Sequence, residues 1–143
     1  MMTRVVIIDD HPIFRQGLRE ILAREPDLEV VGEAGDTVQG RHLLATTAPH
    51  VAVIDLSLPS GSGLDLVVAC RTSTPPVAAL VLTMHAEAST LHAALERGAA
   101  GYVLKENAAH DVLLGVRAVA SGGLYLSPST AGLLRHRRPG ALQ

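Results

Sequence analysis

The sequence predicts an α/β fold in which five buried parallel strands alternate with five helices. Five short apolar runs recur at fairly even spacing, and most are nearly continuous in aliphatic or β-branched residues, as in strands covered on both faces. The segments between these runs place apolar residues at the three- and four-residue spacing of amphipathic helices. This alternation is typical of a doubly wound parallel sheet with helices on both of its faces.

The expected strands are short and contain almost no polar residue. The first ends at a pair of acids, and each later one is separated from its predecessor by a segment long enough for a crossover helix. They span residues 5–8, 28–31, 51–54, 77–82 and 102–104.

The expected helices differ in how clearly their periodicity shows. The first is the clearest, with Phe14, Leu18 and Leu22 on one face, whereas the second, over residues 36–48, is the weakest. Asp36 and Asn107 are expected N-caps, and Gly98 is expected just past a helix C-terminus. The later helices carry their apolar positions at Leu64, Val67 and Val68, at Leu91, Ala94 and Leu95, and at Val112, Leu113 and Val116.

Composition narrows the function classes. The 143 residues suit one domain, whose core must be aliphatic because 48% of residues are hydrophobic and only 2% aromatic. A net charge of −2 argues against nucleic-acid binding over the whole surface. The lone cysteine, Cys70, permits no disulfide framework, and no apolar stretch approaches the roughly 20 residues of a membrane span. We therefore expect a cytoplasmic protein with no membrane partner.

The chain changes character after residue 120. A Ser-Gly-Gly turn and a brief apolar run precede Ser127-Pro128, which is typical of the start of a short helix. Residues 135–138 are then a basic cluster, and Pro139-Gly140 ends whatever precedes it. We expect the main domain to cover residues 1–122, and residues 123–143 to form a C-terminal extension or linker.

Polar residues follow four of the five expected strands. Asp9 and Asp10 follow the first, Asp55 the third, Thr83 the fourth, and Lys105, the only lysine in the chain, the fifth. Each alone has an ordinary explanation as a cap, a turn residue or a solvated cation. In an open parallel sheet, however, the carboxyl ends of the strands form the ligand-binding edge. Their coincidence therefore favours a functional site.

The residue types at this edge suit phosphoryl chemistry. Two carboxylates roughly 4 Å apart repel by about 4 kcal/mol at an effective dielectric near 20, so cations must offset them. Mg²⁺ prefers oxygen ligands, which Asp9 and Asp10 supply, and Lys105 adds a fixed positive charge. A carboxylate is also a nucleophile towards phosphorus, and Asp55 on the central strand is the best placed. Thr83 and Lys105 would then bind the phosphoryl oxygens.

Several short motifs, taken together, are highly specific. They are Asp9-Asp10-His11-Pro12, Phe14-Arg15-Gln16-Gly17-Leu18, Asp55-Leu56-Ser57-Leu58-Pro59, Leu82-Thr83-Met84-His85, Ala94-Leu95, Gly98-Ala99-Ala100-Gly101-Tyr102-Val103-Leu104-Lys105 and Leu124-Tyr125-Leu126-Ser127-Pro128. Over residues 3–130 the chain resembles the response-regulator receiver family, specifically its NarL/FixJ (LuxR-type) branch. The resemblance implies the flavodoxin-like (βα)5 fold, with a five-stranded sheet in the order 2-1-3-4-5.

The resemblance also implies a role for each matching residue. Asp55 resembles the phosphorylated aspartate and Lys105 the phosphate-binding lysine. Asp9, Asp10 and Asp55, with the backbone carbonyl of Ser57, resemble the Mg²⁺ ligands. The switch pair would be Thr83 and Tyr102.

As a family, receivers are phosphoacceptor signalling domains rather than ordinary enzymes. The implied phosphoryl donor is a sensor histidine kinase, and the implied output is control of transcription. This branch usually continues into a helix-turn-helix domain, so DNA binding is expected only through such a domain, which is absent from this chain. A homodimer is a further expected partner.

Two positions depart from the family pattern. Glu106 stands where many receivers have a proline, often after a cis bond, and Leu58 stands where many have methionine.

Two rival classes of protein would require residues that differ from those in this sequence. A phosphatase of the haloacid dehalogenase type needs a second acid where Ser57 stands. A nucleotide or flavin module needs a glycine- or hydroxyl-rich loop after the first strand, and the partial loop Gly61-Ser62-Gly63 follows the third.

Overall fold

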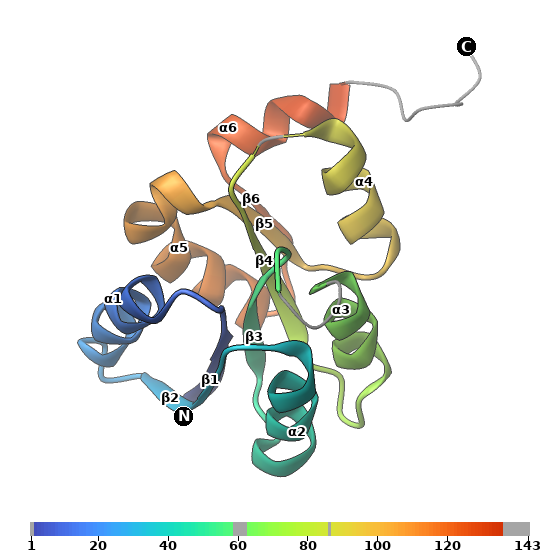
Figure 1. Cartoon of the computed structure of the whole chain (residues 1–143). Coiled ribbons are helices and arrows are strands. Elements are labelled where there is room, and N and C mark those ends of the chain that lie inside the picture. The colour runs from blue at the N-terminus through green and yellow to red at the C-terminus, as the bar shows by residue number, and fades with distance from the viewer. Residues whose placement is uncertain (1, 59–62, 86, 136–143) are drawn as a thin grey trace.

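Strands and helices alternate along the whole described chain (Figure 1). The computed structural model describes residues 2–58, 63–85 and 87–135. The strands are β1 (Thr3–Ile8), β2 (Leu28–Ala34), β3 (Val51–Asp55), β4 (Ala78–Thr83), β5 (Gly101–Leu104) and β6 (Tyr125–Leu126). The helices are α1 (Pro12–Ala23), α2 (Thr37–Thr47), α3 (Gly63–Thr72), α4 (Ala88–Glu96), α5 (Ala108–Ala120) and α6 (Pro128–Ala131), with 3-10 turns η1 (Lys105–Asn107) and η2 (Gly132–Arg135).

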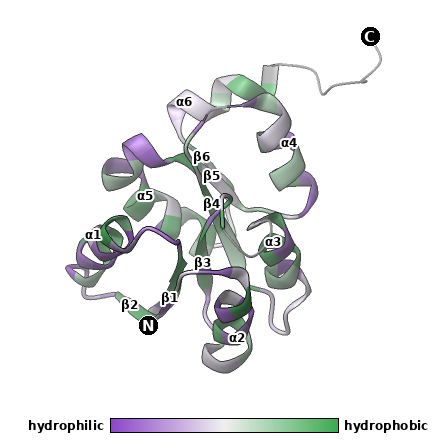
Figure 2. Ribbon diagram, in the orientation of Figure 1, coloured by the Kyte–Doolittle hydropathy of each residue, from purple (hydrophilic) through white to green (hydrophobic). Residues whose placement is uncertain are grey.

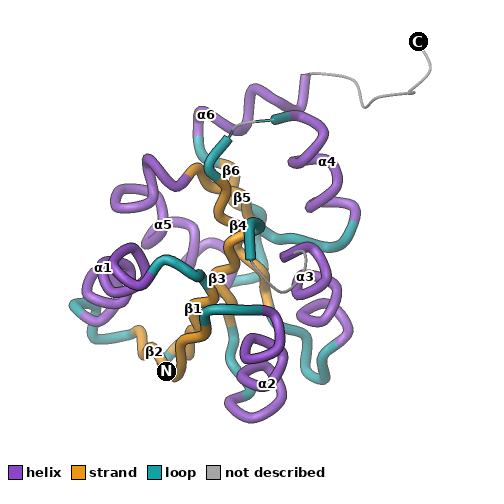
Figure 3. The backbone as a smooth tube through the Cα atoms, viewed as in Figure 1, coloured by secondary structure: helices purple, strands orange, loops and turns teal. Residues whose placement is uncertain are grey.

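The strands form one parallel sheet in the order β2-β1-β3-β4-β5-β6 (Figure 3). The predicted order 2-1-3-4-5 is confirmed, and the short β6 extends the sheet by pairing with β5. The β2 strand runs to Ala34, three residues beyond its expected end at Val31. It lies at the sheet edge, where Gly32 and Glu33 are only partly buried, so the apolar run stops before the strand does.

Helices cover both faces of the sheet, as the alternation predicts (Figure 1). Leu18 and Leu22 of α1 and Val112 and Val116 of α5 pack on one face. On the other face, α2, α3 and α4 bury the cluster that includes Leu44, Leu66, Val67, Leu91 and Ala94. Figure 2 shows the hydrophobic residues concentrated in the strands and on the helix sides that meet them. The core is therefore aliphatic and spans both sides of the sheet.

Helix termini follow the predicted caps in part. The side chain of Asp36 accepts a hydrogen bond from the Gln39 N–H at 2.8 Å and starts α2, the helix with the weakest periodicity. Gly98, with φ of +103°, follows the C-cap of α4, where its lack of a Cβ allows this conformation. Asn107 lies at the N-cap of α5 but makes no side-chain capping bond.

The segment after residue 122 joins the sheet. Tyr125 and Leu126 pair with β5, and the Thr130 hydroxyl donates a hydrogen bond to the Tyr102 carbonyl at 3.2 Å. η2 then lies beside α4 (Figure 1), and Leu133 packs on the same core cluster as Tyr102. Of the predicted basic cluster, residues 136–138 lie outside the described part of the chain. No described helix has the length and apolarity needed to cross a membrane.

Candidate phosphoacceptor site

The carboxyl edge of the sheet carries the predicted polar residues. Asp9 directly follows β1, Asp55 ends β3, Thr83 ends β4, and Lys105 directly follows β5. One potential ligand atom from each of Asp9, Asp10, Asp55 and His11 lies within 4.8 Å of the others. The strand ends therefore gather the acids and the lysine into one cluster, to which the structure adds a histidine.

Lys105 lies between two buried carboxylates. Asp9 and Asp55 are fully buried, and the Lys105 side chain is only 6% exposed. Its Nζ lies 2.8 Å from Asp9 Oδ2 and 3.1 Å from Asp55 Oδ2. The Asp55 contact is a hydrogen bond, whereas Asp9 Oδ2 makes an ion pair without hydrogen-bond geometry. The ammonium also lies 4.7 Å above the centre of the Phe14 ring, which walls the site.

The surroundings of Asp55 and Lys105 raise the pKa values of both groups. Burial raises the pKa of Asp55, although the Ser57 N–H, which donates to Asp55 Oδ1 at 2.9 Å, and Lys105 both act against that rise. Burial alone would lower the pKa of Lys105, but the close contacts and negative charges of Asp9 and Asp55 outweigh it and raise the pKa. The lysine is therefore charged at neutral pH.

The acid cluster fits a hard divalent cation. Asp9 Oδ2 and Asp10 Oδ1 are buried oxygens that make no hydrogen bond within the described part of the chain. With the Asp55 carboxylate they offer the oxygen donors that Mg²⁺ prefers, and the 29% exposure of the Asp10 side chain leaves a side open to water. Mg²⁺ usually retains several waters, so a site with few protein ligands suits it.

His11 is a member of the cluster that the sequence interpretation missed. It occupies the N-cap position of α1, but its side chain makes no capping hydrogen bond. Its Nδ1 lies 3.2 Å from Asp9 Oδ1, 3.2 Å from Asp10 Oδ1 and 3.1 Å from Lys105 Nζ. Its place directly after the acid pair was the only sequence signal for this contact.

Arg15 is a second residue that the sequence did not single out. From the first turns of α1 its Nη1 donates a 2.6 Å hydrogen bond to the backbone carbonyl of Asp9, and its Nε lies 3.2 Å from Glu33 Oε1. The guanidinium thus ties the turn after β1 to the edge strand β2. Because Arg presents several donors in a fixed fork, it can hold the backbone of an acid whose side chain has another task.

Thr83 and Tyr102 lie on the same sheet face, on neighbouring strands. The Thr83 hydroxyl donates to the His85 carbonyl at 3.3 Å, a long local bond. Tyr102 is fully buried, and its hydroxyl makes no hydrogen bond among the described residues. Burial raises the pKa of Tyr102; Thr83 is close enough to counter part of that rise without reaching hydrogen-bond geometry. The phenol therefore already points into the core.

Both rival classes of site lack a necessary feature. At the position where a dehalogenase-type phosphatase needs its second acid, Ser57 uses its backbone N–H to hold Asp55. Of the partial glycine loop, only Gly63 lies within the described residues, at the start of α3. A Cβ there would meet the Asp55 carbonyl oxygen at 2.5 Å, so this glycine allows close packing of α3 on β3. The Lys105–Glu106 bond is not among the cis peptide bonds of the described chain.

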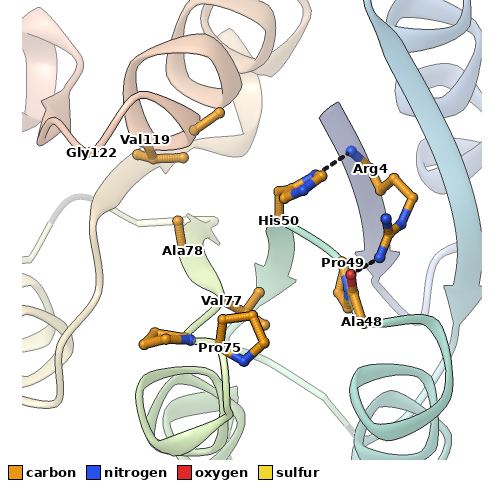
Figure 4. A pocket seen from close by; sticks show the side chains of 11 residues that line it. Arg4, Ala48, Pro49, His50, Pro75, Val77, Ala78, Val119 and Gly122 are labelled. Atoms are coloured by element: carbon orange, nitrogen blue, oxygen red, sulfur yellow. Dashed lines mark hydrogen bonds between the residues drawn. The ribbon is translucent and has the colours of Figure 1, made fainter. Parts of the chain in front are cut away.

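Two of the cavities in the described structure lie at opposite edges of the sheet. One of about 600 Å³ opens beside the cluster and is lined by His11, Ile13, Phe14, Met84, Lys105 and Glu106. Another of about 560 Å³ lies at the amino ends of the strands, where the Arg4 backbone N–H donates to His50 Nδ1 and its guanidinium contacts the Ala48 carbonyl (Figure 4). Since ligands bind at the carboxyl edge of such sheets, the first cavity is the entrance to the site.

Comparison with known proteins agrees with this geometry. The family model for the response regulator receiver domain matches residues 5–117. The transcriptional regulatory protein DegU of Brevibacillus brevis is 37% identical over 136 residues, which cover 94% of this chain and 58% of DegU. This chain therefore spans little more than half the length of that relative.

Solved structures extend the similarity to three dimensions. A LuxR-family two-component response regulator from Aurantimonas sp. SI85-9A1 superposes with a TM-score of 0.88 at 32% identity, over 94% of this chain and 96% of that one. RcsB, solved as two dimers bound to two parallel DNAs, superposes with a TM-score of 0.84 at 32% identity, over 94% of this chain and 69% of that one.

Proposed function

This chain belongs to the response regulator receiver family, and we propose that its Asp55 carboxylate accepts a phosphoryl group from the phosphohistidine of a sensor kinase. The observation that carries the proposal is the buried Asp55 carboxylate, held by Lys105 and by the Ser57 N–H beside two further acids. A receiver is a phosphoacceptor signalling module rather than an enzyme with a separate substrate.

Each residue of the site has a separate proposed role in phosphoryl transfer. An Asp55 oxygen forms the new bond to phosphorus as the bond to the donor's imidazole nitrogen breaks, and the imidazole leaves with its electron pair. Lys105 already contacts the Asp55 oxygen and would move to a phosphoryl oxygen. Asp9, Asp10, Asp55 and the Ser57 carbonyl would hold Mg²⁺, which neutralises the charge that accumulates on the transferring group.

A small phosphodonor tests the proposal directly. With acetyl phosphate and Mg²⁺, intact-mass measurement should show an increase of one phosphoryl group, because acyl phosphates need no kinase to approach an open site. With EDTA in place of Mg²⁺ the increase should disappear. An unchanged mass under both conditions would contradict the proposal, as would equal labelling in EDTA.

We place the output of the site in Thr83, Tyr102 and the surface beside them. An aspartyl phosphate offers new acceptor oxygens, towards which the Thr83 hydroxyl would turn from its long bond to the His85 carbonyl. The space that it leaves adjoins the buried Tyr102 phenol, which would adjust and reshape the face formed by α4 and β5. This coupling would favour a homodimer, the assembly in which RcsB was solved on DNA.

The longer relatives of this chain suggest what its phosphorylation controls. DegU is a transcriptional regulator and is longer than this chain, so the proposed output is control of transcription through a DNA-binding domain outside residues 1–143. We further propose that residues 1–122 are the receiver and that residues 123–143 are a linker, which the pairing of β6 with β5 anchors to the receiver. A reducing cytoplasm is the proposed location, which suits the buried free thiol of Cys70.

Thr83→Val should separate phosphorylation from its output. The variant keeps the acids and Lys105, so it should still take up phosphate, but it loses the hydroxyl that senses the phosphoryl oxygens. A hydrogen bond to a charged group is worth roughly 1.5 to 3 kcal/mol, so the dimer equilibrium should respond at least about tenfold less than in the wild type. Sedimentation with and without a beryllofluoride phosphate mimic measures this. Equal association of both proteins would remove Thr83 from the coupling.

A further inference from the structure

The His11 ring faces the acid cluster from the solvent side. Its Nδ1 is 3.2 Å from Asp9 Oδ1, 3.2 Å from Asp10 Oδ1 and 3.9 Å from Asp55 Oδ2, while 58% of the side chain is exposed. The Asp9 carboxylate beneath it is fully buried, and its Oδ2 forms an ion pair with Lys105 Nζ at 2.8 Å but makes no hydrogen bond in the described chain. The imidazole therefore presents a nitrogen to carboxylate oxygens of three acids at once.

These separations are those of ligands around one ion. For an octahedral cation with bonds of about 2.1 Å, neighbouring donors lie about 3.0 Å apart and opposite donors about 4.2 Å apart. The three distances from Nδ1 to the carboxylate oxygens fall within that interval. The ligand atoms of the four residues lie within 4.8 Å of one another, so small side-chain movements would bring them around one cation.

Neither neutral tautomer of His11 satisfies its surroundings alone. If Nδ1 carries the proton, the ring can bond Asp9 or Asp10 but meets the Lys105 ammonium, also a donor, at 3.1 Å. If Nδ1 carries the lone pair, it accepts from Lys105 but faces two carboxylate oxygens at 3.2 Å. A metal ion between the nitrogen and the oxygens would take the Nδ1 lone pair and offset the carboxylate charges, while Lys105 would keep its hydrogen bond to Asp55 Oδ2.

We propose that His11 is a nitrogen ligand that lets this centre take a divalent transition-metal ion, such as Co²⁺, in preference to Mg²⁺. The inference rests on the proposed function only in sharing its acids. Imidazole is a ligand of Zn²⁺, Ni²⁺ and similar ions, whereas Mg²⁺ selects oxygen. His11 therefore contributes to transition-metal affinity while leaving Mg²⁺ affinity to Asp9 and Asp10.

The test compares Co²⁺ and Mg²⁺ binding to the untagged full chain. Calorimetry gives the affinity for each ion alone, and the visible absorption of Co²⁺ reports nitrogen ligation without any phosphoryl donor. His11→Ala should weaken Co²⁺ binding about tenfold or more and change its spectrum, while the Mg²⁺ affinity stays within about twofold. His110→Ala, which removes an exposed histidine at the start of α5, is the matched control and should change neither ion.

Each result decides the question. Unchanged Co²⁺ affinity and spectrum in His11→Ala would overturn the proposal while leaving the Mg²⁺ centre intact. Equal weakening of both ions would also overturn it, since His11 would then only support the acids. If the wild type bound neither ion, the metal centre of the proposed function would fail as well, an outcome distinct from the first two.

Discussion

Asp55→Asn should reduce phosphoryl uptake from acetyl phosphate at least about 100-fold, because the amide cannot serve as the nucleophile. The neighbouring acids do not replace it, since Asp9 Oδ2 is held by Lys105 and both Asp9 and Asp10 would be occupied by the metal. The substitution should not lower the melting temperature at neutral pH. Burial raises the pKa of Asp55, so folding disfavours its charged form, a penalty that the amide does not carry.

Asp65→Asn is the matched control for that prediction. Asp65 is an exposed acid in the first turn of α3, near the same edge of the sheet, and its neutralisation changes the net charge equally. It should label like the wild type in the intact-mass measurement. Labelling of Asp55→Asn at the wild-type level would assign the phosphoryl group to another residue.

The layered fold could be predicted because every central strand is covered on both faces. Such strands are unbroken apolar runs, as in Val5–Ile8 and Val51–Ile54, whose residues are all fully buried. The β6 strand escaped prediction as a strand because Tyr125 and Leu126 are its only residues, too few to show any period. Its position follows from pairing with β5, a long-range contact that local sequence does not encode.

The acids and the lysine could be predicted for a different reason. A residue directly after a parallel strand lies at the ligand edge whatever its rotamer, so Asp9, Asp55 and Lys105 required only the strand ends. His11 and Arg15 depend on the path of one turn and on side-chain rotamers, which spacing does not specify. The burial of Tyr102 likewise depends on packing by α4 and by the segment around Leu126 and Leu133.

Lys105 and Arg117 are cations with the same kind of partners in opposite surroundings. Arg117 Nη2 lies 2.8 Å from both Glu25 Oε1 and Asp27 Oδ1 at the surface, where solvent screens the pairs. Lys105 contacts Asp9 and Asp55 where both carboxylates are fully buried. Replacing each cation by methionine therefore compares the loss of a buried cation with the loss of an exposed one, each from between two acids.

Lys105→Met should lower the free energy of unfolding by about 3 kcal/mol in EDTA, because it leaves two buried carboxylates without their cation. Arg117→Met should change stability little. Saturating Mg²⁺ should restore much of the loss in Lys105→Met, since an ion bound by the same acids replaces the missing charge and favours the folded state. Urea unfolding with EDTA or Mg²⁺ measures both effects. A Lys105→Met curve that Mg²⁺ does not shift would show that the acids do not hold the ion, and a stability equal to the wild type in EDTA would show that the buried pairs are not stabilising.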